Sequence, residues 1–205
     1  MVGRKRTFSE EQALEAAMDV FWRKGYTGAS LSELTQSMGI NKPSMYATFG
    51  NKEALFVKAT SLYIEKIAKP HTQWLFEEGT RLEKRVKNYM LSIVKSQCES
   101  DDPKGCYVIL CQSEIAGGDM PQAPTELLNE AGQYIQKLLT ELFLNDPQAI
   151  RLGLNHQASS AALSIATTLR GTASMARAKV TFAELQTVIE HCLKGIGINS
   201  DGDKF

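Results

Sequence analysis

The sequence lacks most features of disulfide-linked, membrane-spanning or zinc-binding proteins. Only four of its 205 residues are cysteines, too few for the disulfide framework of a small secreted domain. No two of them form a CxxC pair, and no run reaches the ~18 apolar residues of a membrane span. Arg4, Lys5 and Arg6 are not followed by the apolar segment of a signal peptide. We therefore expect a cytoplasmic protein with no cofactor, no metal and no membrane partner.

Net charge is also absent, because 23 Lys and Arg balance 23 Asp and Glu. The 43% of apolar residues is ordinary for a folded chain and excludes disorder. The balance is uneven along the chain: residues 1–60 hold 8 basic and 6 acidic residues, which leaves 23 − 8 = 15 and 23 − 6 = 17 for residues 61–205. No carboxylate lies between Glu33 and Glu53, whereas Lys42 and Lys52 do. A polyanion would be attracted to this window.

Helix signals recur throughout and strand alternation is nearly absent. Ser9 with Gln12, and Ser30 with Glu33, have the spacing of capping boxes. Gly25 suits the end of the first helix. Asn41 and Asn51 are candidate N-caps of two further helices. The predicted helices cover about 10–24, 31–38, 42–49, 52–69, 81–99, 104–115, 123–144, 155–178 and 181–195. We predict an all-α fold.

The second and third predicted helices and the turn Gly39-Ile40-Asn41 have the lengths of a helix-turn-helix. Met45 and Phe49, four residues apart, would anchor the third helix. Its remaining donors suit phosphate oxygens and base edges of DNA: Lys42, Ser44, Tyr46 and Thr48. The alternative is a short surface helix of a bundle, which would not need two capping boxes, this turn and an acid-free window.

Residues 9–56 resemble the DNA-binding region of the TetR family of bacterial transcriptional regulators. The resemblance rests on Ala16-Ala17 with Phe21, Gly25-Tyr26-Thr27, Ser30-Leu31 with Leu34, Met38-Gly39-Ile40, Lys42 to Phe49, and Lys52 to Phe56. It implies DNA contacts by Thr27, Ser30, Lys42, Ser44, Tyr46, Thr48 and Lys52. One departure is Tyr46-Ala47-Thr48, where many members have two aromatic residues and a His; Ala47 has no side-chain donor.

The resemblance also implies a domain organisation and a function. Residues 1–50 would form the helix-turn-helix domain, 51–69 a connecting helix, and 70–205 a larger helical ligand-binding and dimerisation domain. The protein would be a repressor that binds a palindromic operator as a homodimer and is released by an apolar or aromatic effector. Small residues dominate 155–178, which would allow another helix to approach closely. Ordinary packing within one chain is the alternative.

Aromatic and aliphatic residues of the middle helices are candidates for an effector pocket, although residues at such spacing also form ordinary cores. The candidates are Trp74, Tyr89, Met90, Ile93, Tyr107, Leu110, Tyr134 and Phe143, with Ile109 and Leu138 beside them.

A thiol trigger is the second hypothesis for regulation. Cys98 ends one predicted helix and Cys106 begins the next, so their thiols could meet across residues 101–105. A helix N-terminus would favour the Cys106 thiolate. Gly105-Cys106 and Ser113-Glu114 resemble a stretch of family members that sense electrophiles or oxidants. The alternative is that these cysteines are buried and inert.

Two other classes of protein find little support. An enzyme is disfavoured because His71, His156 and His191 lie far apart in sequence and no GxSxG, P-loop or GxGxxG motif is present. A helical adaptor that binds only proteins would not need Lys42 and Lys52 around an acid-free helix.

Overall fold

The computed structural model describes residues 8–99 and 105–198. These residues form helices and turns without a strand, which confirms the all-α prediction. The predicted arm Arg4-Lys5-Arg6 and residues 101–104 of the loop between Cys98 and Cys106 lie outside the described residues. No helix within 8–99 or 105–198 combines the length and apolar character needed to cross a membrane. The chain divides into two compact units, residues 1–67 with 107–130 and residues 68–106 with 131–205.

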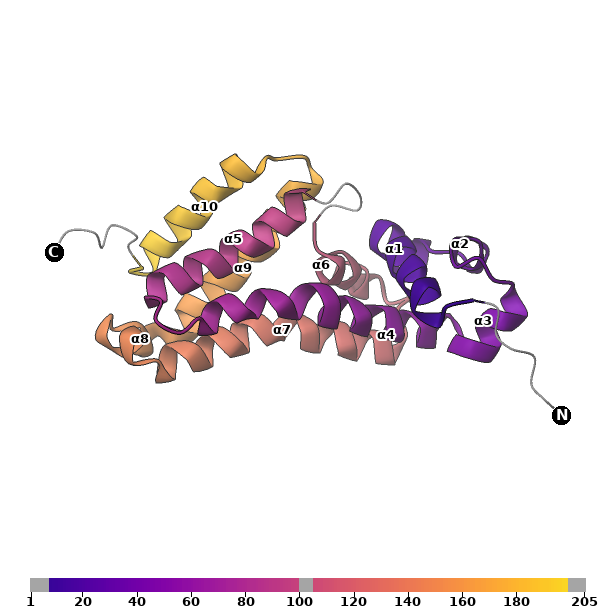
Figure 1. The fold of residues 1–205 in the computed structure, drawn as a ribbon, viewed down its shortest axis with the longest axis horizontal. Coiled ribbons are helices and arrows are strands. Elements are labelled where there is room, and N and C mark those ends of the chain that lie inside the picture. Colours follow the sequence, from indigo (N-terminus) through magenta and orange to yellow (C-terminus); the bar gives the residue numbers. More distant parts are fainter. Residues whose placement is uncertain (1–7, 100–104, 199–205) are drawn as a thin grey trace. The chain divides into compact units, whose positions relative to one another are not determined.

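The first unit is built from α1 (Glu10–Gly28), α2 (Leu31–Ser37), α3 (Lys42–Phe49), α4 (Lys52–Tyr63) and α6 (Tyr107–Gln112). The short 3-10 helix η3 (Ile115–Gly117) and the first residues of α7 (Gln122–Asn145) complete it. Figure 1 shows α1, α2 and α3 in succession. The core of this unit is aromatic: Phe21 meets the edge of Phe56 with ring centroids 5.0 Å apart, and Tyr63 stacks on Tyr107 at 5.1 Å.

The predicted caps of this unit are present in the structure. Ser9, Asn41 and Asn51 each accept a hydrogen bond from the backbone N–H three residues later. At Ser30 both halves of the capping box form with Glu33. These local bonds start the helices at or within one residue of where the sequence placed them.

Two helix ends differ from the prediction. The break expected at Gly25 occurs there (φ 73°), but helical turns resume and carry α1 to Gly28. The helix expected to run from 52 to 69 ends as an α-helix at Tyr63 and continues as the π-turn η1 (Ile64–Ala68) and the 3-10 helix η2 (Lys69–Phe76). Pro70 does not end the helical segment, since it lies in the first turn of η2, where its missing N–H needs no partner.

The second unit is a bundle around α5 (Leu82–Glu99), which packs against α9 (Ala158–Arg177) and α10 (Phe182–Gly195), as Figure 1 shows. Its core includes Tyr89, Met90, Phe143, Ile165 and Leu193. An ion pair between Arg85 and Asp146 (2.6 Å) lies at its edge.

Further helix bounds in the C-terminal two-thirds also differ. The helix predicted over 104–115 is the shorter α6, followed by η3, because Gly105 has a φ of 83°, outside the helical region. The sequence did not predict α8 (Pro147–Arg151), whose first amides donate to the Asp146 carboxylate. The helix predicted over 155–178 begins as the 3-10 helix η4 (Leu154–Gln157) before α9.

Candidate nucleic-acid interface

The turn between α2 and α3 closes through a Schellman motif. Gly39 N–H donates to Gln36 O (3.2 Å) and Ile40 N–H to Thr35 O (3.1 Å). Gly39 has a φ of 65°, which glycine adopts without strain. The motif fixes the direction in which the chain leaves α2, and Asn41 then starts α3.

Helix α3 is anchored on one side and open on the other. The Met45 and Phe49 side chains are buried, as the sequence predicted for an anchor. Lys42 and Tyr46 are exposed, Tyr46 by 49%, and Ser44 and Thr48 are half-buried. The four donors expected on this helix therefore all retain access to solvent.

Lys58 on α4 supports the C-terminal end of α3, a role the sequence analysis missed. Its ammonium group lies 5.5 Å from the centroid of the Phe49 ring and donates to Thr48 O at 3.4 Å. A cation at this position complements the negative end of the helix dipole. The i+9 spacing from Phe49 gave no local pattern by which Lys58 could be recognised.

The other three predicted DNA-contact residues flank this helix pair. Thr27 is exposed at the end of α1, and Ser30 is exposed but its hydroxyl donates to Glu33 at 2.9 Å. Lys52 is half-buried, with its ammonium group 4.6 Å from the centroid of the Tyr26 ring. Burial lowers the pKa of Lys52, and the charge of Glu114 opposes that shift.

Acidic residues of the first unit are paired with lysines. Lys66 binds both Glu11 and Glu15 on α1, the latter at 2.7 Å. Lys24 binds Glu33. The hydrogen bond from Lys24, followed by those from the Ser30 backbone and hydroxyl, lowers the pKa of Glu33 to about 2. By contrast, Lys42 has no ion pair within the described part of the chain.

Helix α6 and the residues after it join the helix-turn-helix to a distant part of the sequence. The Tyr107 hydroxyl is 2.9 Å from Thr60 Oγ1, and burial raises the pKa of Tyr107. Glu114 accepts hydrogen bonds from the backbone N–H groups of Tyr26 (2.7 Å) and Thr27 (3.2 Å). The sequence analysis named Glu114 only beside the cysteines and missed this contact, which spans 87 and 88 residues.

The residues predicted to line an effector pocket are distributed over both units. Tyr107 and the half-buried Leu110 belong to the first unit. In the second, Tyr89, Met90 and Phe143 are fully buried in one core, against which the partly buried Trp74 and Ile93 pack. Tyr134 is 40% exposed. The Tyr89 hydroxyl is buried without a hydrogen-bond partner among the described residues.

The two cysteines predicted as a thiol trigger, Cys98 and Cys106, are both half-buried. The Cys98 thiol lies 3.9 Å from Val180 O, and Cys106 directly precedes α6. Residues 8–99 and 105–198 contain no cluster of three or more His, Cys, Asp or Glu side chains suited to a metal ion.

Two capped helices joined by a Schellman turn, the second short and anchored by two apolar side chains, define a helix-turn-helix protein. Residues 13–59 match the family model described as bacterial regulatory proteins, tetR family. The fold resembles a cysteine mutant of the TetR family regulator CifR solved with 26-bp double-strand operator DNA (29% identity, TM-score 0.82, 94% of this chain and 98% of that chain). Residues 13–59 thus match the TetR-family DNA-binding region, and the chain is similar in fold to a TetR-family regulator over 94% of its length.

Curated relatives agree with this assignment. The transcriptional repressor ComR of Escherichia coli K12 is 36% identical over 107 residues, which are 52% of this chain and 51% of ComR. The repressor BdcR of the same organism is 44% identical over 68 residues, or 33% and 34% of the two chains. The chain thus spans about half the length, or less, of these curated relatives. TetR-family regulators are DNA-binding transcription factors and not enzymes.

Proposed function

We propose that this protein is a transcriptional repressor that binds a palindromic DNA operator through α3. The observation that carries the proposal is the division of α3 into a buried side, Met45 and Phe49, and an accessible side that carries four donors. Such a helix has the length and chemistry to enter a major groove. The complex of CifR with operator DNA and the repressor names of ComR and BdcR support it.

Each predicted contact residue has a distinct role in this proposal. Lys42, exposed at the start of α3, binds a phosphate, because its ammonium group has no ion pair to break among residues 8–99 and 105–198. Tyr46, with Ser44 and Thr48, faces the groove. At the flank of the helix pair, phosphates are bound by Thr27, Ser30 and Lys52. The Ser30 hydroxyl must first leave its hydrogen bond to Glu33, and the Lys52 ammonium group must first leave its position over the Tyr26 ring.

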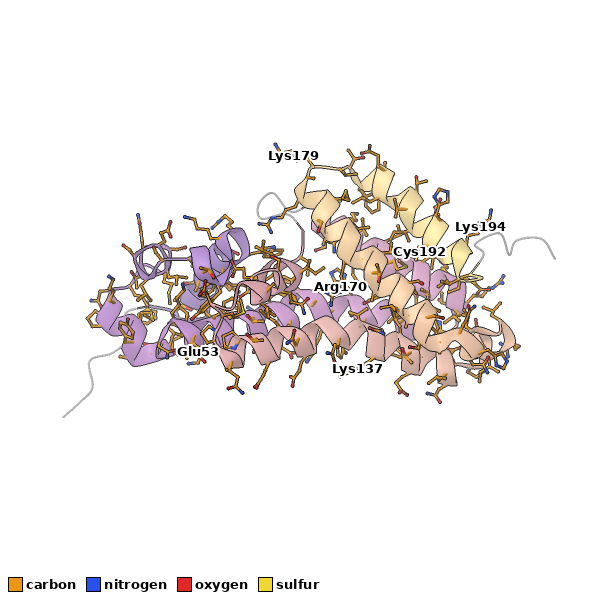
Figure 2. The ribbon with its side chains drawn as sticks, turned by 180° about the vertical axis from the view of Figure 1, so that it is seen from behind. Glu53, Lys137, Arg170, Lys179, Cys192 and Lys194 are labelled. Carbon is orange, nitrogen blue, oxygen red and sulfur yellow. The ribbon has the colours of Figure 1, made fainter. Side chains whose placement is uncertain are left out.

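Homodimerisation through α9 and α10 is part of the proposal. The exposed side of α9 carries small residues at spacings of three or four, namely Ser160, Ser164, Thr167, Gly171 and Ser174. Two larger apolar residues, Leu163 (50% exposed) and Met175 (49% exposed), lie on the same helix. Figure 2 labels Arg170 on α9 and Cys192 on the adjacent α10. Small residues let a second helix approach closely, and two-fold symmetry matches a palindromic operator.

The domain assignment follows from these roles. Residues 1–50, with Lys52 at the start of the connecting segment 51–69, carry DNA binding, and 70–205 carry the effector site and the dimer interface. Tyr89 supports an effector with a polar group: its buried hydroxyl, without a partner in the described residues, is a donor that a ligand oxygen or nitrogen would satisfy. The aromatic and aliphatic residues around it favour an otherwise apolar molecule.

A thiol response is the alternative form of regulation. Cys106 is partly accessible and directly precedes α6, the helix whose Tyr107 bonds to Thr60 on α4. Oxidation or alkylation of this thiol would perturb α6. DNA release by an oxidant that persists in Cys106→Ser would exclude this alternative.

DNA binding is tested on duplexes that the wild-type protein selects from a random-sequence pool, with affinity measured by fluorescence anisotropy against salt. Lys42→Ala/Tyr46→Ala should abolish specific binding. Lys42→Ala alone should reduce the slope of log K against log salt by about 0.9 per lost phosphate contact, about 1.8 for a dimer. Lys137→Ala is the matched control, because that exposed lysine lies in the second unit. Failure of the wild-type protein to select any duplex, or undiminished affinity of the double variant, would refute the proposal.

A further inference from the structure

We propose that Glu114 is a positioning residue that holds the last turn of α1 in the geometry required for DNA contact. This inference rests on the proposed DNA-binding function and adds a residue that lies 87 positions from the segment it orients. Glu114 itself would not touch DNA in this role. It would act through the backbone of Tyr26 and Thr27.

The two hydrogen bonds compensate for the break in α1. Gly25 has φ 73° and ψ −175°, so the peptide between Gly25 and Tyr26 is rotated out of the helical orientation. The N–H groups of Tyr26 and Thr27 meet one carboxylate oxygen of Glu114 at 2.7 Å and 3.2 Å. A carboxylate that receives two backbone N–H groups forms strong, charge-assisted hydrogen bonds. The side chain of Glu114 therefore caps the resumed turn from outside the helix.

Gly25 leaves the space that this carboxylate occupies. A Cβ placed on Gly25 would overlap both carboxylate oxygens of Glu114, and the positive φ would strain any other residue there. Glycine is thus required at position 25 for the turn and for the approach of Glu114. Gly25 and Glu114 thus form a joint, by which we mean the close contact of these two residues between α1 and the segment after α6.

The joint lies beside two residues with proposed phosphate contacts. Thr27 is held directly through its N–H. Lys52 lies over the ring of Tyr26, whose N–H is the other donor to Glu114. On the other side, α6 is tied to α4 by the bond between Tyr107 and Thr60. The segment that carries Glu114 therefore follows a helix that is itself bound to α4.

Simple electrostatics and positioning predict opposite effects when Glu114 is changed. A carboxylate near DNA repels phosphates, so its removal alone would tighten binding. If Glu114 orients Thr27, loss of its reach must weaken binding even where repulsion is lost as well. A variant that keeps the charge and loses reach separates the two explanations, because electrostatics alone predicts no change in its affinity and positioning predicts a loss.

Two conservative variants separate charge from reach. Glu114→Gln keeps a side-chain oxygen at the same length and loses the charge, whereas Glu114→Asp keeps the charge and is one methylene shorter. We expect Glu114→Asp to bind the selected duplex about tenfold more weakly and Glu114→Gln to bind at least as well as the wild type. Glu130→Ala, which removes an exposed acid of the same unit, should not weaken binding.

Amide hydrogen exchange in the free protein gives a readout independent of DNA. The Tyr26 and Thr27 amides should lose protection in Glu114→Asp and keep most of it in Glu114→Gln. If the wild type binds DNA and Glu114→Asp binds equally well or more tightly, or if both amides stay protected in that variant, the inference is wrong while the proposed function stands. If the wild-type protein selects no DNA, the proposed function itself fails.

Discussion

Two adjacent residues of α3 should separate folding from recognition. Met45 is completely buried, and Tyr46, the next residue, is 49% exposed. Truncation of a buried methionine to alanine removes buried side-chain atoms and leaves a cavity, at a cost of about 2–5 kcal/mol in the free energy of unfolding. Tyr46→Ala removes no buried atoms of this size, so its effect on stability should stay within about 0.5 kcal/mol. Although Tyr46→Ala should hardly change stability, we expect it to lower the affinity for DNA.

The two tryptophans of the chain allow each unit to be monitored. Trp22 is buried in α1 of the first unit, and Trp74 lies in η2 of the second. In a Trp74→Phe background, the fluorescence of Trp22 reports the first unit during urea unfolding. With an m-value of about 2 kcal/mol/M, Met45→Ala should lower the midpoint by about 1–2.5 M. Tyr46→Ala should leave the midpoint within about 0.3 M while specific DNA affinity falls.

Either of two results would refute this reasoning. An unchanged midpoint in Met45→Ala would mean that α3 is not held by its buried side. A midpoint in Tyr46→Ala that falls as far as in Met45→Ala would mean that Tyr46 is a structural residue, and loss of DNA binding in that variant would then say nothing about contact. Circular dichroism of both variants at low denaturant checks that the helices remain.

Two further predictions concern the second unit. Burial raises the pKa of Asp146, but hydrogen bonds from Arg85 and the N–H groups of Gln148 and Ala149 lower it more, to below its ordinary 3.8. This stabilisation is complete above that ordinary value and is lost as pH falls through the folded-state pKa. Asp146→Asn should lower the free energy of unfolding by about 3–5 kcal/mol at neutral pH, because Arg85 is left buried without its counter-charge. Between neutral pH and about pH 3, the urea midpoint of this variant should change less than that of the wild type. An equal change in both proteins would contradict this prediction. Gly171→Glu on α9 should convert the proposed dimer to a 22.6 kDa monomer in sedimentation. A Cβ at Gly171 meets nothing within 4 Å in the chain itself, so the new side chain should disturb the interface and not the fold. Gly117→Glu, at a glycine that is also in open space, should leave assembly unchanged. A dimer that survives Gly171→Glu would exclude this face of α9 as the interface.

The caps and turns of the first unit were predictable because their partners are close in sequence. Ser30 and Glu33, or Asn41 and the Ser44 amide, are three residues apart, so the side-chain type at a given spacing specifies the bond. The burial of Met45 and Phe49 was predictable for the same reason, since two apolar residues four apart share a helix face.

The predictions that differed depend on contacts remote in sequence or on alternatives of equal local energy. The contact of Glu114 with Tyr26 bridges 88 residues, and no local pattern encodes it. The turn of α1 that resumes after Gly25 carries the two amides that Glu114 accepts from, whereas the glycine alone predicts that the helix ends there. An aromatic residue at helical spacing has the same pattern in a core and in a pocket, so the assignment of Tyr107, whose hydroxyl bonds to Thr60, to an effector site stays a prediction.

The pairing of charges explains how a chain of zero net charge can present a cationic helix. Lys66 binds Glu11 and Glu15, and Lys24 binds Glu33, so these two lysines offset two of the three negative charges that would otherwise oppose the lysine of α3. Lys58 is drawn to the carbonyl end of α3 and Lys52 to the ring of Tyr26, which leaves Lys42 as the cation on α3 that needs no rearrangement to meet a phosphate. Since each phosphate contact adds about 0.9 to the salt slope, few such contacts imply a shallow slope. Discrimination between operators must then depend on the neutral donors Tyr46, Ser44 and Thr48, and therefore on how firmly Met45 and Phe49 hold α3 in register with the groove.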